Sequence, residues 1–269
     1  FAAGDGAVWR NFRKSPNISQ KRGGRSVAQE ENKSGYFKGL SRQDYIKKTH
    51  EIMKKEGVEA VSIRRIAAEL GCSSASLYRH FENREELLYY AELRTLKSYI
   101  DSLNRAERTW SNMWDIYVGI WDCYAREAFA HPEAYNLLFF IYPNKKLNKA
   151  IREYYEIFPE DLKRTNRFFQ EMLKTPDFMS RDFEMCKKCI NDGAVTYENA
   201  IRLNRMVCML FAGYFKKVLD EGIEEYQIGE RVDQFIKDVD TIVKALAKDL
   251  KGYTGYKPVS YTHLRAHET

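Results

Sequence analysis

The sequence predicts an all-α protein with a three-helix helix-turn-helix head followed by a larger helical bundle. Three observations lead to this prediction. Two short apolar helical patterns lie on either side of a glycine between residues 61 and 88, helical periodicity continues to about residue 251, and no alternating β pattern of useful length occurs. The expected parts are a leader at 1–35, the head at 36–88, the body at 89–252 and a tail at 253–269.

The helix-turn-helix is the feature on which the interpretation depends. Its first helix has an apolar face made of Ile63, Ile66, Ala67 and Leu70. Ser62 precedes this face and can cap the helix, and Gly71 follows it, where a positive φ is favoured. Ser73 can cap the second short helix. The small side chain of Ala67 allows the two helices to approach, and Leu77 fills the space between them.

Two further helices complete the head. We expect one to begin at Ser41 or Asp44 and to end near Gly57. Asn83 is expected to cap a long helix that starts at Arg84 and continues through Ile100. This helix would couple the head to the body. Within the body, breaks between helices are expected at His131-Pro132, Tyr142-Pro143, Phe158-Pro159, Thr175-Pro176 and Asn191-Asp192-Gly193.

The exposed side of the second short helix is polar and carries no acidic residue. Outward-projecting side chains are expected at Ser74, Ser76, Arg79 and His80, with Tyr78 half exposed. The positive end of the helix dipole also suits phosphates and base edges. The alternative is a helical hairpin in an all-α core with a solvated polar face.

A longer motif continues through this region, and its residues are Ile66-Ala67-x-x-x-Gly71-Cys72-Ser73-x-x-Ser76-Leu77-Tyr78-x-His80-Phe81-x-Asn83-Arg84-x-x-Leu87. It resembles the N-terminal signature of the TetR/AcrR family of transcriptional regulators. Cys72, Ser76 and Arg84 depart from the residues usual in that family. The resemblance covers about residues 41 to 90, and the overall length and helical character extend it to about residue 251.

The resemblance implies which side chains contact DNA. Base edges would be contacted by Arg64, Ser74, Ala75 and Ser76, with Arg64 the candidate for a guanine. Phosphates would be contacted by Ser62, Tyr78, His80 and Arg84, while Arg79 could serve either purpose. Ser73 belongs to the same DNA-binding set as the cap of the second helix.

The last two helices carry the pattern of a packing seam. Apolar residues recur at alternating steps of four and three after Gly222, and the helix before it is apolar almost all round between Met206 and Phe215. The alternative is an ordinary core helix. Because regulators of this family dimerise through their last helices, the expected dimer interface comprises Met206, Leu210, Val232, Ile236, Val239, Val243 and Leu246.

Aromatic residues concentrate in the middle of the body, where a small molecule would bind between helices. The candidate ligand-binding residues are Trp114, Trp121, Tyr124, Phe140, Tyr154 and Phe168. Aromatic residues at helical spacing also serve as core filler. The sequence does not identify the effector.

Composition limits the other classes of function. The net charge of +6 permits a nucleic-acid partner without requiring one. The odd number of scattered cysteines and the lack of a secretory signal favour a cytoplasmic setting, and no apolar run approaches the about 20 residues that span a bilayer. Cys186 and Cys189 lack the further ligands that zinc needs. We therefore expect no metal, no cofactor and no catalysis.

Both ends of the chain are expected to lie outside the fold. Residues 1–35 could be a basic arm that enters a minor groove, through Arg10, Arg13, Lys14, Lys21, Arg22 and Arg25, or a disordered or non-native leader, which is favoured. Pro258–Thr269 resembles a translated cloning artefact.

Three hypotheses follow from these observations. The favoured one is a homodimer that binds a palindromic operator in double-stranded DNA and acts as a repressor released by a small-molecule effector. The second is a constitutive or architectural DNA-binding protein without a ligand response. The third is an all-α enzyme or interaction module that contains a helical hairpin. The operator, the sign of regulation and the genes controlled cannot be derived from the sequence.

Overall fold

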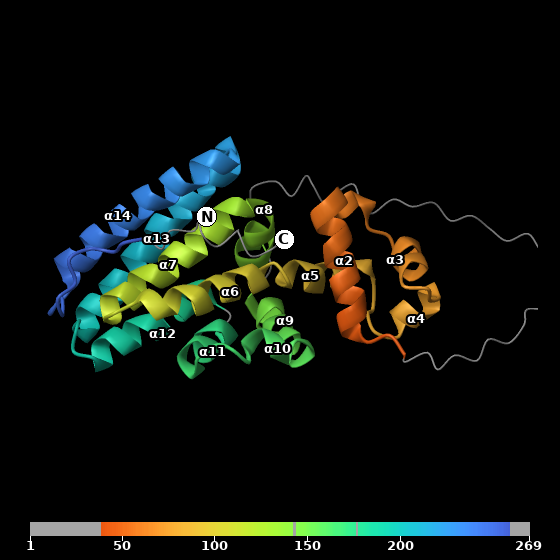
Figure 1. Cartoon of the computed structure of the whole chain (residues 1–269), viewed down its shortest axis with the longest axis horizontal. Coiled ribbons are helices and arrows are strands. Elements are labelled where there is room, and N and C mark those ends of the chain that lie inside the picture. The colour runs from red at the N-terminus through yellow and green to blue at the C-terminus, as the bar shows by residue number, and fades with distance from the viewer. Residues whose placement is uncertain (1–38, 142–143, 176, 259–269) are drawn as a thin grey trace, which may run out of the picture. The chain divides into compact units, whose positions relative to one another are not determined.

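The computed structural model describes residues 39–141, 144–175 and 177–258, with side chains for all of these except 141–148. The expected leader, the predicted breaks at Tyr142-Pro143 and at Pro176, and residues 259–269 of the tail lie outside the described residues. No β-strand occurs within the described ranges. The predicted all-α class is confirmed (Figure 1).

The α-helices of the described chain are α2 (Arg42–Glu56), α3 (Ile63–Glu69), α4 (Ser74–Tyr78), α5 (Arg84–Leu93), α6 (Leu96–Ala106), α7 (Met113–Ala130), α8 (Pro132–Asn136), α9 (Asn144–Ile157), α10 (Pro159–Leu162), α11 (Arg167–Lys174), α12 (Phe178–Asn191), α13 (Tyr197–Glu221) and α14 (Ile228–Leu246). Short 3₁₀ turns lie at Val58–Ala60, Glu107–Thr109 and Glu225–Gln227, and a π-helical turn lies at Leu137–Ile141.

Helix α2 begins and ends where the sequence predicts. The Ser41 side chain accepts a hydrogen bond from the Asp44 backbone N–H at 3.4 Å, and the Asp44 carboxylate accepts one in return from the Ser41 backbone at 2.8 Å. This reciprocal capping box satisfies two N–H groups that a helix start leaves without partners. At the other end Gly57 has a φ of 84°, which favours glycine.

The long helix expected after Asn83 is interrupted, which corrects that prediction. Asn83 does cap α5, but Arg94 and Thr95 separate α5 from α6. The backbone N–H groups of Arg94 and Thr95 bond to carbonyls three residues back instead of four, at 3.2 and 2.9 Å. The Arg94 guanidinium is anchored here, 4.6 Å from the centre of the Phe158 ring and 3.8 Å from the Asp161 carboxylate.

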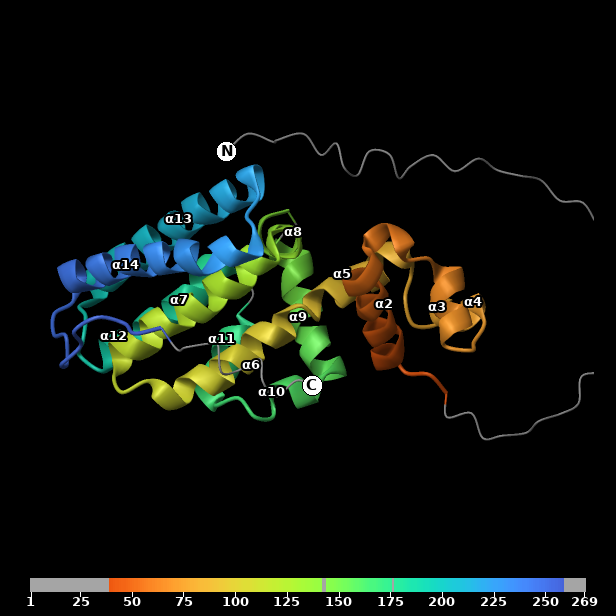
Figure 2. The same cartoon turned by 45° about the horizontal axis from the view of Figure 1, so that its top comes forward.

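Helices α7, α13 and α14 pack against one another and run side by side in both views, with α14 on the outer side of the body (Figures 1 and 2). The predicted breaks at Pro132 and Pro159 are confirmed, since each proline occupies the first turn of a new helix. The break after Asn191 is confirmed as well, and Gly193 there has a φ of 74°.

Gly119 in α7 is required by the indole of Trp110, which lies directly over it. A Cβ added at Gly119 would lie less than 3.0 Å from the Trp110 ring. We expect Gly119→Ala to destabilise the protein by about 1–2 kcal/mol in urea unfolding, because overpacking outweighs the helix propensity of alanine.

Gly213 in α13 provides the matched control for this prediction, since a Cβ at that position meets no atom within 4 Å. Gly213→Ala is expected to stabilise the protein by about 0.5–1 kcal/mol. Equal effects of the two substitutions would contradict the proposed role of Trp110.

The chain after α14 is partly integrated into the body, which corrects the predicted boundary at residue 252. Tyr253 and Tyr256 are buried, and the Tyr256 backbone N–H donates to Asp240 at 3.1 Å. The indole N–H of Trp114 donates to the Asp249 carbonyl at 2.9 Å. This packing could not be predicted from the sequence, because Tyr253 and Tyr256 show no helical periodicity and their partners lie on other helices.

Candidate nucleic-acid interface and ligand cavity

The helix-turn-helix is assembled by caps that the sequence encodes locally. The Ser62 hydroxyl accepts a hydrogen bond from the Arg65 backbone N–H at 3.2 Å, and the Ser73 hydroxyl accepts one from the Ser76 N–H at 3.3 Å. Gly71 has a φ of 65°, which permits the sharp turn between α3 and α4. The predicted caps and turn are confirmed.

The two short helices are held by a small apolar core. Ile66, Leu77 and Phe81 are almost completely buried, and Ala67 lies at the crossing. Tyr45 of α2 closes this core, and its hydroxyl lies 2.9 Å from the Ser76 hydroxyl. Burial raises the pKa of Tyr45, so the phenol stays protonated and can donate.

One face of the head remains exposed around α4. Most of the predicted DNA-contacting residues are exposed or half-buried there, namely Ser62, Arg64, Ser73, Ser74, Ala75, Tyr78, Arg79 and His80. The Tyr78 side chain is 55% exposed, although it is large and partly apolar. A polar face with an exposed aromatic ring is suited to phosphate and base contacts.

Arg64 and its neighbour Arg65 differ in their partners. The Arg65 guanidinium is held between two carboxylates, 2.7 Å from Glu56 and 2.8 Å from Glu69. These carboxylates raise its pKa further above the ordinary arginine range. Within the described residues Arg64 has no ion pair or hydrogen bond and is exposed. Of these two guanidiniums, Arg64 is therefore the one available to a base edge.

Besides the capping serines, three of the predicted DNA contacts have intramolecular side-chain or backbone partners. Ser76 is only half-exposed: its hydroxyl lies 2.9 Å from the Tyr45 hydroxyl and accepts a hydrogen bond from the Arg79 guanidinium at 3.1 Å. A base contact by Ser76 stays a prediction. Arg84 donates to the backbone carbonyls of Val61 and Val58 at 3.0 and 3.1 Å. A phosphate contact by Arg84 stays a prediction, and its guanidinium also fixes the segment before α3.

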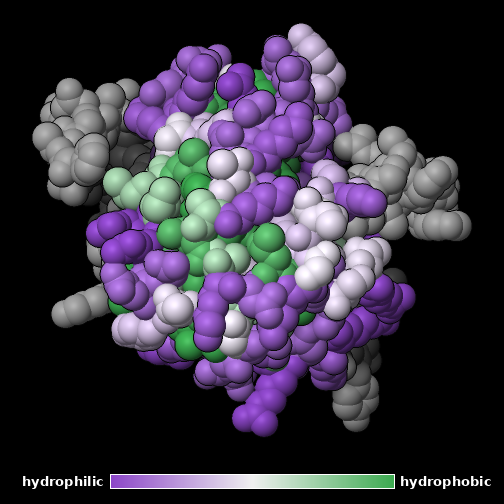
Figure 3. All heavy atoms as spheres, turned by 90° about the vertical axis from the view of Figure 1, so that its left-hand side faces the viewer, coloured by the Kyte–Doolittle hydropathy of each residue, from purple (hydrophilic) through white to green (hydrophobic). Residues whose placement is uncertain are grey.

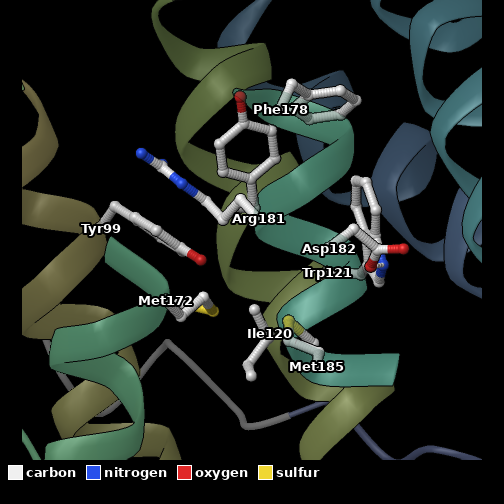
Figure 4. A pocket seen from close by; sticks show the side chains of 9 residues that line it. Tyr99, Ile120, Trp121, Met172, Phe178, Arg181, Asp182 and Met185 are labelled. Carbon is white, nitrogen blue, oxygen red and sulfur yellow. Dashed lines mark hydrogen bonds between the residues drawn. The ribbon is translucent and has the colours of Figure 1, made fainter. Parts of the chain in front are cut away.

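A cavity of ≈ 20 Å³ lies in the body, enough for about one water molecule. Its walls come from α6, α7, α11 and α12, and the lining residues are Tyr99, Ile120, Trp121, Tyr124, Met172, Phe178, Arg181, Asp182 and Met185 (Figure 4). Trp121 and Tyr124, two predicted ligand residues, are among them. Sequence reasoning missed the others because buried polar residues such as Arg181 have no periodic signature.

The other four predicted ligand residues do not line this cavity, and their assignment to a ligand site stays a prediction. Trp114 supports the segment after α14, and the Tyr154 hydroxyl donates to Asp161 at 2.8 Å. Phe140 is exposed and stacks on Phe215, with ring centres 5.2 Å apart. Phe168 packs under Lys188. A high local content of aromatic residues therefore indicates the hydrophobic core of this body rather than the position of its cavity.

The predicted dimer interface needs a correction. Val232, Ile236, Val239 and Val243 are buried within the protomer, where α14 packs against α7 and α13. They therefore offer no surface to a second chain. Met206 is 46% exposed, and Leu210 and Leu246 are half-buried, so only these three remain available. A seam at steps of four and three shows that a helix packs there but not which chain supplies it.

The cysteines and other candidate ligands do not form a metal site in the described part of the chain. Cys186 and Cys189 are free and buried. Burial raises the pKa of both thiols, that of Cys189 to about 12, which makes them unreactive. Among the described residues no group of three His, Cys, Asp or Glu could hold a metal, and no described helix is long and apolar enough to cross a membrane.

Comparison with known proteins agrees with this geometry. Residues 46–91 match the family described as bacterial regulatory proteins, tetR family. An HTH-type transcriptional regulator of Staphylococcus aureus (strain MRSA252) is 28% identical over 130 residues, covering 46% of this chain and 70% of the relative. A second, from strain USA300, is 34% identical over 67 residues, covering 25% of this chain and 36% of the relative. The match thus spans only about a third of that second relative.

A solved structure of a protein with unknown function from Rhodococcus sp. RHA1 is similar over 80% of this chain and 100% of its own. The TM-score is 0.51 and the sequence identity is 21%. This likeness extends beyond the head into the body. It supports the fold only, and no function follows from it.

Proposed function

We propose that this chain, a transcriptional regulator of the tetR family of bacterial regulatory proteins, is a homodimeric repressor that binds a palindromic operator and is released by a small-molecule effector. The proposal of DNA binding rests on one observation: the exposed polar face around α4 lies beside Arg64, which has no ion-pair partner among the described residues. The proposal places the protein in the cytoplasm, where its DNA partner is.

The geometry of the head supports insertion of α4 into the major groove. Arg64 can present two donors to the O6 and N7 acceptors of a guanine, and Ser74 and Ala75 would face neighbouring base edges. Tyr78 and His80 would hold phosphates and so set the register. A helix as short as α4 reads few bases, so useful specificity needs a second head on a half-site about one DNA turn away.

The exposed face of α13 supports dimerisation. Along this helix Ile201, Met206 and Met209 are 43%, 46% and 59% exposed, and Leu210 beside them is half-buried. Exposed apolar residues gathered on one helix face favour a protein interface. Figure 3, which views the left-hand side of Figure 1, shows hydrophobic residues gathered between hydrophilic ones on the face that it draws.

We expect Met209→Glu to convert the dimer to a monomer at micromolar concentration, because the substitution would bury an unpaired carboxylate in the interface. Light scattering coupled to size exclusion measures this directly. Lys163→Glu, at an exposed position between α10 and α11, is the control and should leave the mass unchanged. A wild-type protein that is already monomeric would contradict the dimer proposal.

The second hypothesis, a constitutive DNA-binding protein without a ligand response, is supported by one specific observation. The cavity lined by Trp121 and Tyr124 is ≈ 20 Å³, far smaller than the few hundred Å³ typical of pockets for small organic molecules. Two larger hollows of ≈ 1290 and ≈ 870 Å³ also lie on the described chain, but neither is lined by a predicted ligand residue. Release by an effector that binds among the predicted aromatic residues therefore requires this cavity to widen. The effector can shift the DNA-binding equilibrium only by its differential affinity for the two states, typically about 1–3 kcal/mol.

The test of the proposed function is binding of the full-length protein to DNA that flanks its own gene, across a salt series. Tight, sequence-selective binding with a steep salt dependence is the expected result, and the slope reports the number of phosphate contacts. Weak binding that is equal on random DNA would favour an architectural protein. Absence of binding at low salt would overturn the assignment as a DNA-binding regulator.

A further inference from the structure

A cationic side chain is buried in the body without an anionic partner. Arg181 in α12 lines the cavity and is 5% exposed. Its Nε donates to the Thr175 carbonyl at 2.9 Å and one terminal nitrogen donates to the Leu173 carbonyl at 3.3 Å. Its other terminal nitrogen, Nη1, is buried and has no hydrogen-bond partner among the described residues. No described carboxylate lies within ion-pair distance of it.

This arrangement is energetically unusual. A buried guanidinium is normally paired with a carboxylate, because removing its charge from water is costly. Here the two backbone carbonyls and the Phe139 ring, whose centre lies 5.2 Å from the guanidinium carbon, replace only part of that hydration. The remaining donor, Nη1, is available to an anion.

Tyrosine hydroxyls near Arg181 also lack partners. The hydroxyls of Tyr124, Tyr135 and Tyr155 are buried and form no hydrogen bond within the described residues. The ring centres of Tyr124 and Tyr135 lie 5.9 and 5.8 Å from that of Phe139, the ring over which the Arg181 guanidinium lies. Burial raises the pKa of each of the three phenols, and the positive charge of Arg181 opposes this rise. Several unpaired donors beside one unpaired cation make a site that is complementary to an anionic acceptor.

Asp182 lines the same cavity but does not neutralise Arg181. Its carboxylate accepts from the indole N–H of Trp121 at 2.9 Å and from the Asn204 amide at 2.8 Å. Figure 4 shows the Arg181 and Asp182 side chains leaving α12 in different directions. Burial raises the pKa of Asp182 to about 6, so its carboxylate is still mostly ionised at neutral pH, and it is the indole and amide donors that hold its charge.

The rest of the cavity wall is apolar and adjustable. Trp121 and Phe178 contribute aromatic surface, while Met172 lies across from Trp121 and Met185 lies below it in Figure 4. Methionine side chains are unbranched and repack easily, so the space beside the guanidinium can widen without disrupting a rigid core.

We infer that the effector is an organic acid with an apolar or aromatic body, whose carboxylate binds the Arg181 guanidinium and the Tyr124 hydroxyl while its body displaces the two methionines. This inference rests on the proposed function, because it names the ligand class of that regulator. The bound carboxylate would supply the missing partner of the buried charge.

The test is titration of the protein with acetate, phenylacetate and octanoate, each beside its neutral amide, using calorimetry and tryptophan fluorescence. At least one acid is expected to bind about ten-fold or more tightly than its amide. Arg181→Gln should weaken that binding on the order of 100-fold. Equal binding of acids and amides, or no binding by any of the acids, would overturn the inference.

Tyr124→Phe keeps the test independent of folding. Removing a hydroxyl that has no partner should leave thermal stability unchanged or higher, yet weaken binding of the acid about ten-fold. Tyr154→Phe is the matched control, because its hydroxyl is bonded to Asp161 and should affect stability but not affinity. The reverse pattern would contradict the assignment of Tyr124. Measuring DNA binding on the same samples separates failure of this inference from failure of the proposed function.

Discussion

Arg64→Ala is expected to weaken binding to the operator more than any other single substitution on the exposed face of the head. A bidentate arginine–guanine contact contributes about 1–3 kcal/mol of discrimination, and a dimer makes two of them. The expected loss of affinity is therefore about 30-fold to about 20,000-fold. Fluorescence anisotropy with the operator and with random DNA measures both the affinity and the specificity.

Arg65→Gln is the matched control for Arg64→Ala. The two residues are adjacent on the same helix and both substitutions remove one positive charge, but Arg65 is held by Glu56 and Glu69. Its replacement should therefore reduce affinity equally for operator and random DNA and keep their ratio. If Arg64→Ala also leaves that ratio unchanged, Arg64 does not contact a base.

Leu77→Ala is expected to cause the largest loss of stability in the head. Leu77 of α4 is completely buried against α3. Its truncation to alanine would leave a cavity that the few surrounding side chains cannot fill. We expect a cost of about 2–5 kcal/mol, as in other buried leucine-to-alanine substitutions. Hydrogen exchange of residues 63–81 would show the loss of protection, and operator binding would fall with it.

Tyr78→Ala separates stability from recognition in the same helix. Tyr78 is the next residue along the chain but is largely exposed, so its truncation should change stability by no more than about 0.5 kcal/mol. Operator affinity should nevertheless decrease, because a phosphate contact is lost. Loss of protection in α3 after Tyr78→Ala, equal to that after Leu77→Ala, would contradict this division of roles.

Local features of the head could be predicted because their causes are local. Ser62, Ser73 and Asn83 cap helices through hydrogen bonds to residues three positions away, and Gly71 permits a backbone conformation that other residues disfavour. Pro132 and Pro159 begin helices because proline lacks an N–H that the first turn does not need. Each of these signals is complete within a few consecutive residues.

Features that depend on distant partners were predicted incompletely or wrongly. The Ser76 hydroxyl lies 2.9 Å from the hydroxyl of Tyr45, a partner on another helix that no local pattern indicates. Six aromatic residues were equivalent ligand candidates by composition, yet only Trp121 and Tyr124 line the cavity. At the break after α5, Arg94 contacts Phe158 and Asp161, which lie far along the chain and could not be paired with it from the sequence.

The sequence by itself determined the helix-turn-helix, its caps and the all-α class, because helical periodicity and capping are short-range properties. The tertiary structure alone decided that α14 packs within its own protomer, leaving the apolar face of α13 exposed. It also decided that Arg181 is buried beside unpaired tyrosine hydroxyls. A periodic apolar pattern predicts that a helix face is buried. Whether a helix of the same chain or of a second chain buries it depends on the tertiary packing.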